Sequence, residues 1–313
     1  MDSKMDNKKH EKGNMCKTAP LNCKKTKSFT GEESMLSIFQ HIKTYQYFPF
    51  QPEFEGMADY YTEHREKNIW NQTVLLFYQF RLKKDLHHAV SVVPDGCIDI
   101  LFGCNEQDCF ANICGSVIRS RMIHLQAGSE YFGVRFLPYQ EVLRSNYMVK
   151  EIVDKEVPLI DMISIQHTTI EKIILAEGFQ ERVGLFKELI GKVVFPSDGS
   201  MNIIGQVLNK IYESKGNMNI SQLAGKVGYS TRYIRKQFKE SIGISPKRFS
   251  QIVRYQSALN MLLKMKNFTI WDIINENGYY DQAHFIHEFK SFGSLTPREY
   301  TEKFFGKLRC DVE

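Results

Sequence analysis

Two stretches near the carboxyl end of this 313-residue chain repeat one pattern. The first, ISQLAGKVGYSTRYIRKQFKESIGISP, runs from Ile220 to Pro246, and the second, IWDIINENGYYDQAHFIHEFKSFGSLTP, runs from Ile270 to Pro297. Their apolar, glycine, aromatic and proline positions recur first fifty and then fifty-one residues apart. The repeat predicts two tandem copies of one helical module. The extra residue of the second copy is expected inside the first turn of that module's second helix.

Each copy has the layout of a helix-turn-helix. A short helix with apolar residues at i, i+3 and i+4 leads to Gly228 or Gly278, which tolerates left-handed backbone angles, and a second helix follows. In such modules the second helix enters the major groove of DNA. We therefore expect residues 201–305 to be an all-α DNA-binding domain.

The second helix of the first copy separates into two faces. Ile234 and Phe238 are four residues apart and are expected to point inward. A cationic stripe lies beside them at helical spacing, formed by Arg232, Arg235, Lys236 and Lys239. Ser230 precedes this helix and can cap its free backbone N–H groups.

The second copy carries the same inward pair with a less charged outer face. Phe285 and Phe289 are expected to be buried, and Asp281 can act as the N-cap. Four side chains are left to face outward or sideways, namely Gln282, His284, Ile286 and His287.

From about Ser200 to Phe304 the chain resembles the DNA-binding domain of AraC-family transcription regulators. The residues that carry the resemblance, in matching order, are Ile270, Ile273, Gly278, Tyr279, Asp281, Gln282, His284, Phe285, Phe289, Lys290, Leu295, Thr296, Pro297 and Tyr300. One position departs from the family pattern, because Ser294 stands where the family has glycine and Gly293 comes one place earlier. A different local geometry is therefore open at the turn into the last helix.

The resemblance implies a sequence-specific reader of double-stranded DNA that also works with RNA polymerase. A long helix over Ser245 to Lys264 would join the modules, so that their second helices enter successive major grooves about 34 Å apart. The residues expected at base edges are Arg232, Arg235, Lys236, Gln282 and His287. The residues expected to contact phosphate or to position these helices are Ser230, Thr231, Lys239, Asp281 and His284.

Charge divides the chain in the same way. Residues 201–309 hold 17 Lys plus Arg against 8 Asp plus Glu, whereas residues 28–200 hold 16 against 23. Only the C-terminal part therefore matches the charge of DNA. Residues 1–27, with eight lysines and three acids, are expected to be a disordered basic tail. The sequence has no apolar run long enough to span a membrane, so a bacterial cytoplasmic protein, bound to the nucleoid when on DNA, is expected.

Short strand-forming runs occupy the first half, so the expected fold class is α+β. They are 73–80, 89–93, 98–102, 122–126 and 131–136, and they predict a β-rich domain over 28–137, a barrel or a sandwich. Helical periodicity follows within 138–195, at 139–146, 159–176 and 180–194, and Pro196 to Ser200 has the composition of a linker. AraC-family resemblance implies a cupin-like barrel that binds a small-molecule effector, and a homodimer formed through the helices of 138–195. The segments 94–97 and 132–136 are also similar to a sensor-domain type found beside some AraC-like DNA readers.

Catalytic, cofactor and metal sites are not expected. His87 and His88 are adjacent and would point to opposite faces of a strand, unlike the His-x-His pattern of metal-dependent cupins. Arg135, between Val134 and Phe136, is predicted to be exposed or paired structurally; the alternative is that it points into a barrel to receive an anionic ligand.

Four cysteines raise two further hypotheses. Cys97, Cys104, Cys109 and Cys114 lie within eighteen residues, which would suit a thiol-responsive or metal-responsive regulator, but their spacing lacks Cys-x-x-Cys. Small buried thiols are the favoured interpretation. A DNA-repair or other DNA-bound enzyme with a cysteine nucleophile is the rival function, although no Pro-Cys-His type of cluster occurs in the sequence.

Overall fold

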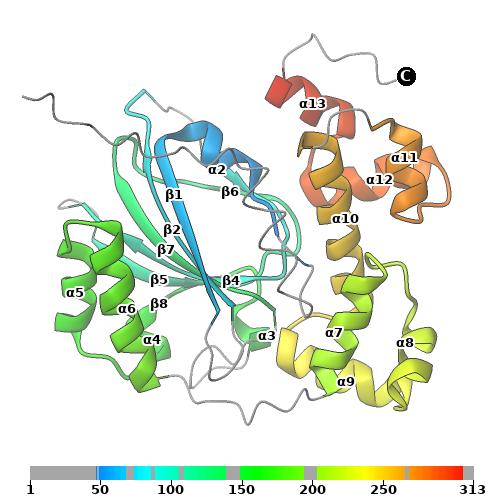
Figure 1. Ribbon diagram of the computed structural model, residues 1–313, viewed down its shortest axis with the longest axis horizontal. Coiled ribbons are helices and arrows are strands. Elements are labelled where there is room, and N and C mark those ends of the chain that lie inside the picture. The colour runs from blue at the N-terminus through cyan, green and yellow to red at the C-terminus, as the bar shows by residue number, and fades with distance from the viewer. Residues whose placement is uncertain are drawn as a thin grey trace, which may run out of the picture. The chain divides into compact units, whose positions relative to one another are not determined.

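The computed structural model describes residues 47, 49–67, 74–85, 89–105, 109–138, 149–193, 203–264 and 268–305. All of these belong to one compact unit, in which a β-rich part precedes a helical part (Figure 1). This confirms the α+β fold class. The expected basic tail 1–27, the expected linker 196–200 and the helix expected at 139–146 lie outside the described residues.

The strands of the described residues form two antiparallel sheets. The larger has the order β1-β2-β7-β4-β5-β8, and the smaller pairs β3 with β6. The strands are β1 (Ala58–Lys67), β2 (Val74–Leu82), β3 (Val90–Val92), β4 (Ile98–Gly103), β5 (Phe110–Cys114), β6 (Arg121–Ile123), β7 (Glu130–Phe136) and β8 (Glu156–Pro158). No pairing joins the end strands β1 and β8 in the described part of the chain, so the large sheet has an open order rather than that of a closed ring.

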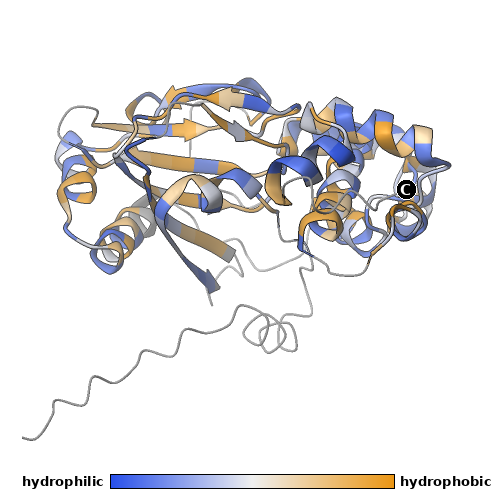
Figure 2. Cartoon of the chain, turned by 90° about the horizontal axis from the view of Figure 1, so that it is seen from above, coloured by the Kyte–Doolittle hydropathy of each residue, from blue (hydrophilic) through white to orange (hydrophobic). Residues whose placement is uncertain are grey.

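One face of the large sheet is an apolar core covered by two helices, α5 (His167–Leu175) and α6 (Phe179–Val193). Phe186 of α6 lies with its ring centroid 6.0 Å from that of Phe77 on β2 and 6.1 Å from that of Phe102 on β4. The two helices alternate hydrophobic and hydrophilic residues along their length, as expected where only one side is buried (Figure 2). On the opposite face Tyr78, Leu101 and Tyr131 form a second cluster that includes residues of the small sheet.

The predicted strands 73–80, 89–93, 98–102, 122–126 and 131–136 overlap β2, β3, β4, β6 and β7. Strands β1, β5 and β8 were not predicted, because β1 (ADYYTEHREK) is rich in charged residues and β8 is only three residues long. The helix predicted over 159–176 is wrong in one respect. It is interrupted after α4 (Leu159–Met162), where the buried Ile163 adopts an extended backbone (φ −134°).

Seven helices make up the helical part in the described residues. They are α7 (Ile203–Glu213), α8 (Ile220–Val227), α9 (Thr231–Ile242), α10 (Pro246–Lys264), α11 (Ile270–Glu276), α12 (Gln282–Gly293) and α13 (Pro297–Phe305). Helix α10 packs against α7, α9, α11, α12 and α13. The predicted joining helix is therefore present, and its first turn is capped by the Ser245 hydroxyl, which accepts the Arg248 N–H at 3.2 Å.

The two modules have the predicted cores and caps. Ile234, Phe238, Phe285 and Phe289 are fully buried, with 0% exposure. The Ser230 hydroxyl accepts the backbone N–H of Tyr233, and the Asp281 carboxylate accepts that of His284.

The extra residue of the second module does not lie in the first turn of its second helix, as expected, but in the turn just before that helix. The N-caps Ser230 and Asp281 are equivalent, so α9 and α12 correspond residue for residue from their first positions. The extra residue is Tyr280, which lies in the preceding turn and is 91% exposed. A turn in solvent accommodates an insertion without shifting the buried face of the helix that follows.

Ser294 adopts a backbone conformation that usually requires glycine. It ends α12 in the left-handed region (φ 65°), as Gly243 ends α9 (φ 86°). In both copies the N–H of this residue bonds to the carbonyl four residues earlier, Lys290 or Lys239. The turn therefore keeps the same geometry in both modules, and the departure from the family pattern places a strained serine there.

Loss of either core phenylalanine is expected to unfold its module. Phe238→Ala and Phe289→Ala each remove a fully buried ring, so the free energy of unfolding of the full chain should fall by about 3–5 kcal/mol. Tyr233→Ala on α9 and Tyr280→Ala before α12 are matched controls, because both rings are exposed. Denaturant titration of the four variants measures this. Equal losses in core and control variants would contradict the shared-core interpretation.

Ser294→Gly is expected to stabilise the chain. Glycine adopts φ 65° without the Cβ penalty, which outweighs its larger unfolded-state entropy, so the free energy of unfolding should rise by about 0.5–1 kcal/mol. Ser291→Gly, in the same helix but at ordinary helical angles, should lower it. Thermal melting of both variants compares the two positions, and a loss at Ser294 would show that its backbone is unstrained.

Candidate DNA-binding surface

Helix α9 presents its predicted cationic stripe to solvent. Arg232, Arg235, Lys236 and Lys239 are all exposed, while the same helix buries Ile234 and Phe238 underneath. Thr231, at the first position, is half-buried. Of the sites predicted on this helix, the structure therefore brings the four charged groups together on one accessible face, where they can approach a polyanion.

Helix α12 presents a polar, weakly charged face. Gln282 and His287 are exposed, as predicted for residues that reach base edges. His284 is tied into the turn, because its Nδ1 accepts the Tyr280 backbone N–H at 3.3 Å and its ring packs edge-on against Tyr279. This contact supports the positioning interpretation of His284.

A buried ion pair fastens α12 to the joining helix. Arg254 of α10 donates from its Nε and terminal nitrogen to the two carboxylate oxygens of Glu288, at 2.8 and 2.6 Å. Gln251 donates a third hydrogen bond to Glu288 at 3.0 Å. Such a two-pronged geometry restricts rotation of α12 on α10. The orientation of α12 is thereby set by contacts within the helical part itself.

The β-rich part contacts the ends of α9 and α12. The backbone N–H of Ser120 donates to the Phe292 carbonyl at the end of α12, at 2.7 Å. The Arg248 guanidinium of α10 donates to the Ile118 carbonyl at 2.5 Å and lies 4.0 Å from the centre of the Phe292 ring. Helix α3 (Val149–Ile152) packs against α9 near Gly243.

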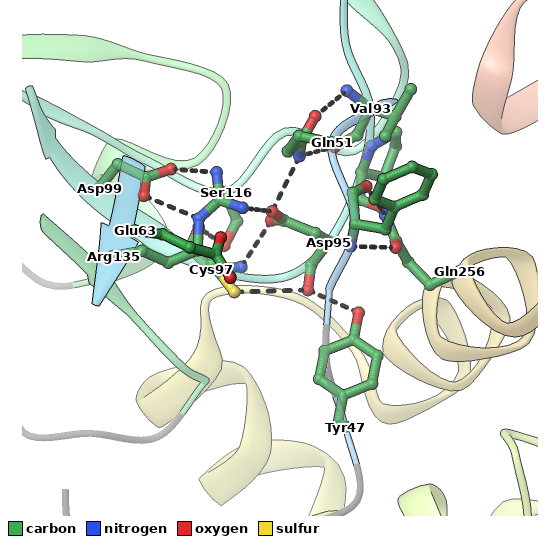
Figure 3. Close-up of polar contacts among 12 residues, drawn as sticks. Tyr47, Gln51, Glu63, Val93, Asp95, Cys97, Asp99, Ser116, Arg135 and Gln256 are labelled. Carbon is green, nitrogen blue, oxygen red and sulfur yellow. Dashed lines mark hydrogen bonds and ion pairs between the residues drawn. The ribbon is translucent and has the colours of Figure 1, made fainter. Parts of the chain in front are cut away.

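Asp95 is the centre of a polar network between the strands and α10 (Figure 3). Its carboxylate accepts hydrogen bonds from the Gln51 amide and the Cys97 backbone N–H, at 2.8 and 2.9 Å. Its carbonyl accepts the Tyr47 hydroxyl at 2.7 Å. The Tyr47 ring in turn stacks on Tyr212 of α7, with ring centroids 4.7 Å apart. Through Tyr47, Asp95 is therefore connected with the core of the helical part.

Gln256 of α10 completes this junction. Although it is only 2% exposed, its amide is fully engaged: it donates to the Pro94 and Phe50 carbonyls and accepts the Phe50 backbone N–H. Gly96 lies beside it in the left-handed region, and a Cβ there would come within 2.6 Å of the Phe249 ring. The Pro94–Gly96 segment is thus a docking point for α10.

Arg135 is buried and paired, as the first of the sequence alternatives allowed. It donates to both carboxylate oxygens of Asp99, at 2.8 and 2.9 Å, and lies 3.2 Å from the Asp95 carboxylate. Burial by itself would lower the pKa of Arg135, but the two carboxylates raise it well above its ordinary value. The neighbouring Gly133 leaves room for the Tyr78 ring, since a Cβ would lie 2.0 Å from it.

The four described cysteines do not form one cluster. Cys97 and Cys114 lie at one end of the β4–β5 hairpin and Cys104 and Cys109 at the other, about 15–20 Å away along the strands. Burial raises the pKa of the Cys104 thiol to about 11, and it raises those of the Cys97 and Cys114 thiols well above their ordinary values. These three groups are therefore protonated near neutral pH and are poor nucleophiles. In the described residues, no three His, Cys, Asp or Glu side chains gather so as to hold a metal ion.

Known proteins match the helical part most clearly. Residues 223–303 match a family model described as a helix-turn-helix domain. An uncharacterized HTH-type transcriptional regulator of Haemophilus influenzae is 36% identical over 90 residues, which is 29% of this chain and 30% of that protein. The F1 operon positive regulatory protein of Yersinia pestis is 35% identical over 101 residues, 32% of this chain and 33% of that protein. The C-terminal part of the chain is an AraC-type helix-turn-helix domain.

A solved structure of a probable AraC family transcriptional regulator from Rhodopseudomonas palustris covers 33% of this chain and 96% of that one, with 28% identity and a TM-score of 0.30. The chain spans a third or less of the length of the curated relatives named above, and their similarity covers about a third of this chain. Residues 70–158 match a separate family model, a domain of unknown function (DUF6597). No described helix has the length and apolar character to cross a membrane.

Sequence reasoning missed the buried polar residues that hold α10 against α12 and against the β-rich part. Glu288 could have been found, because it interrupts the buried stripe formed by Phe285, Phe289 and Phe292 on α12. Gln256 offers a similar signal on the buried face of α10. Asp95 offers none beyond its place in a Pro-Asp-Gly turn, since its partners lie far away in the sequence.

Proposed function

We propose that this protein is a sequence-specific DNA-binding transcription regulator. The observation that carries the proposal is the pair of capped recognition helices, α9 and α12, held on one rigid helix with their predicted contact residues exposed. In this proposal Arg232, Arg235 and Lys236 reach base edges from α9, and Gln282 and His287 do so from α12. Ser230, Thr231, Lys239, Asp281 and His284 position the helices or contact phosphate.

Arg235→Ala and Lys239→Ala are expected to weaken DNA binding in different ways. A duplex selected by the full chain from a random library provides the specific site. Arg235→Ala should cost about 1–3 kcal/mol on that duplex and relax the preference at one base pair. Lys239→Ala should weaken selected and random duplexes alike and reduce the salt slope of binding by about one.

Fluorescence anisotropy at several salt concentrations, with both duplexes, measures these effects. Glu240→Ala is the matched control on the same helix, because it removes an exposed acid and should leave the base preference unchanged. Identical effects of the Arg235 and Lys239 changes on both duplexes would refute the division of roles. Failure of the unaltered chain to select any duplex would refute the proposed function itself.

The β-rich part is proposed to bind a small effector and to pass its binding on to the DNA reader. A cavity of about 420 Å³ in this part supports the first step, since small-molecule sites have such volumes. The second is supported by the contacts of its loops with α10 and α12, namely Pro94 to Gln256 and Ser120 to Phe292. An effector that changes these loops would change how α10 and the end of α12 are held against the β-rich part.

We further propose, from the family resemblance, a homodimer formed through residues 138–195 and a contact with RNA polymerase. Leu175 of α5 supports the former, because this large apolar side chain is 73% exposed. Leu175→Glu is expected to shift the full chain from dimer to monomer in sedimentation experiments. An unchanged sedimentation coefficient would exclude Leu175 from the dimer contact.

A further inference from the structure

The cavity of the β-rich part has an apolar wall and a charged floor. It is lined only by residues between 51 and 156, so it belongs to this part alone. The wall includes Phe54, Leu101, Phe110 and Ile123. The floor includes Asp95, Asp99 and Arg135, which come from the turn before β4, from β4 itself and from β7.

The charges of the lining do not balance. It contains three carboxylates, Asp95, Asp99 and Glu156, and two guanidinium groups, Arg121 and Arg135. With His124 of the lining counted as neutral, one negative charge is in excess. Glu156 pairs with Arg121 where both are partly exposed. The excess therefore falls on the buried cluster in which Asp95 and Asp99 share Arg135. An unbalanced buried charge is costly, and a bound cation would remove the cost.

Arg135 is poorly placed to receive an anion. Three of its N–H groups face carboxylates and its side chain is only 8% exposed. An anionic ligand would have to displace Asp99 or Asp95 and would then face the negative charge that it displaced. The anion-binding alternative considered for Arg135 from the sequence is therefore disfavoured by this geometry.

Of the two carboxylates that share Arg135, Asp99 is the one that a ligand can reach more easily. Its side chain is 16% exposed, against 5% for Asp95. Its oxygens accept one hydrogen bond each from Arg135 and a further one from the Tyr78 side chain, and a carboxylate can accept about four, so one more donor can bind. Burial also raises the pKa of the Asp99 carboxyl group, with Arg135 opposing the shift, so this group gains from additional positive charge.

We propose that this cavity binds a small organic cation, an amine with an apolar body, whose ammonium group donates to Asp99. The body packs on the wall formed by Leu101 and Phe110. This inference rests on the proposed function, in that it names the class of effector bound by the β-rich part. Asp95 shares Arg135 with Asp99 and contacts Tyr47, so the cation acts next to the junction with α10.

Three probes of one shape and different charge test the proposal on the full chain without DNA. They are phenethylamine, phenethyl alcohol and phenylacetate, compared at equal ionic strength by thermal melting. With a dissociation constant of about 1 mM, the amine at about 10 mM is expected to raise Tm by about 3 °C. The alcohol should raise it by less than half as much, and phenylacetate should not raise it.

Asp99→Asn removes the excess charge while preserving shape, and it should abolish the advantage of the amine over the alcohol. Asp59→Asn, an exposed position on β1, makes the same chemical change outside the cavity and should preserve that advantage. A larger shift with phenylacetate, equal shifts with all three probes, no shift with any probe, or an amine shift that persists in Asp99→Asn would each overturn the proposal.

If Asp99→Asn fails to fold, the three probes on the unaltered chain decide alone. Because melting is measured without DNA, failure here is distinct from failure of the proposed function. The latter would appear as the absence of a selected duplex.

Discussion

Burial of α10 is the constraint on which the rest of the described structure depends. Its 19 residues rise about 1.5 Å each, so the helix spans roughly 28 Å between the two modules. Phe249, Tyr255 and Leu259 are fully buried against helices of both modules. A joint of this kind resists bending, because any tilt would open a cavity in a close-packed core.

The same helix carries polar groups that water cannot reach. Gln256 satisfies carbonyl and N–H groups of the β-rich part, and Arg254 satisfies Glu288 of α12. If either partner moved away, a buried donor or acceptor would be left without a hydrogen bond, at a cost of about 1–3 kcal/mol. These contacts favour one docked arrangement of α10 on the strands and on α12.

The two faces of the large sheet differ in the residues that they bury. The face under α5 and α6 is a uniform aromatic and aliphatic core, which only stabilises. The other face places Asp99 and Arg135 on adjacent strands in a confined space, where two acids share one guanidinium. Buried charges of this kind do not favour a stable core, and such departures are expected at binding sites.

The tandem modules could be predicted from the sequence, because each depends on contacts between residues close in the chain. The spacing of Phe238 and Phe289, the caps Ser230 and Asp281, and the left-handed turn at Gly228 all act within a few residues. The predicted position of the extra residue was wrong by only a few residues from its actual place at Tyr280. A loop turn and the first turn of a helix have similar sequences.

What the tertiary structure alone decided involves residues far apart in the sequence. Charge-rich β1 is a strand because β2 pairs with it, and the role of Asp95 depends on Tyr47, on Arg135 and on a turn that docks against α10. Local periodicity reports which face of an element is buried, but not against what. The helical modules were therefore determined by the sequence pattern itself, whereas the junction and the charged cavity follow from packing between distant segments.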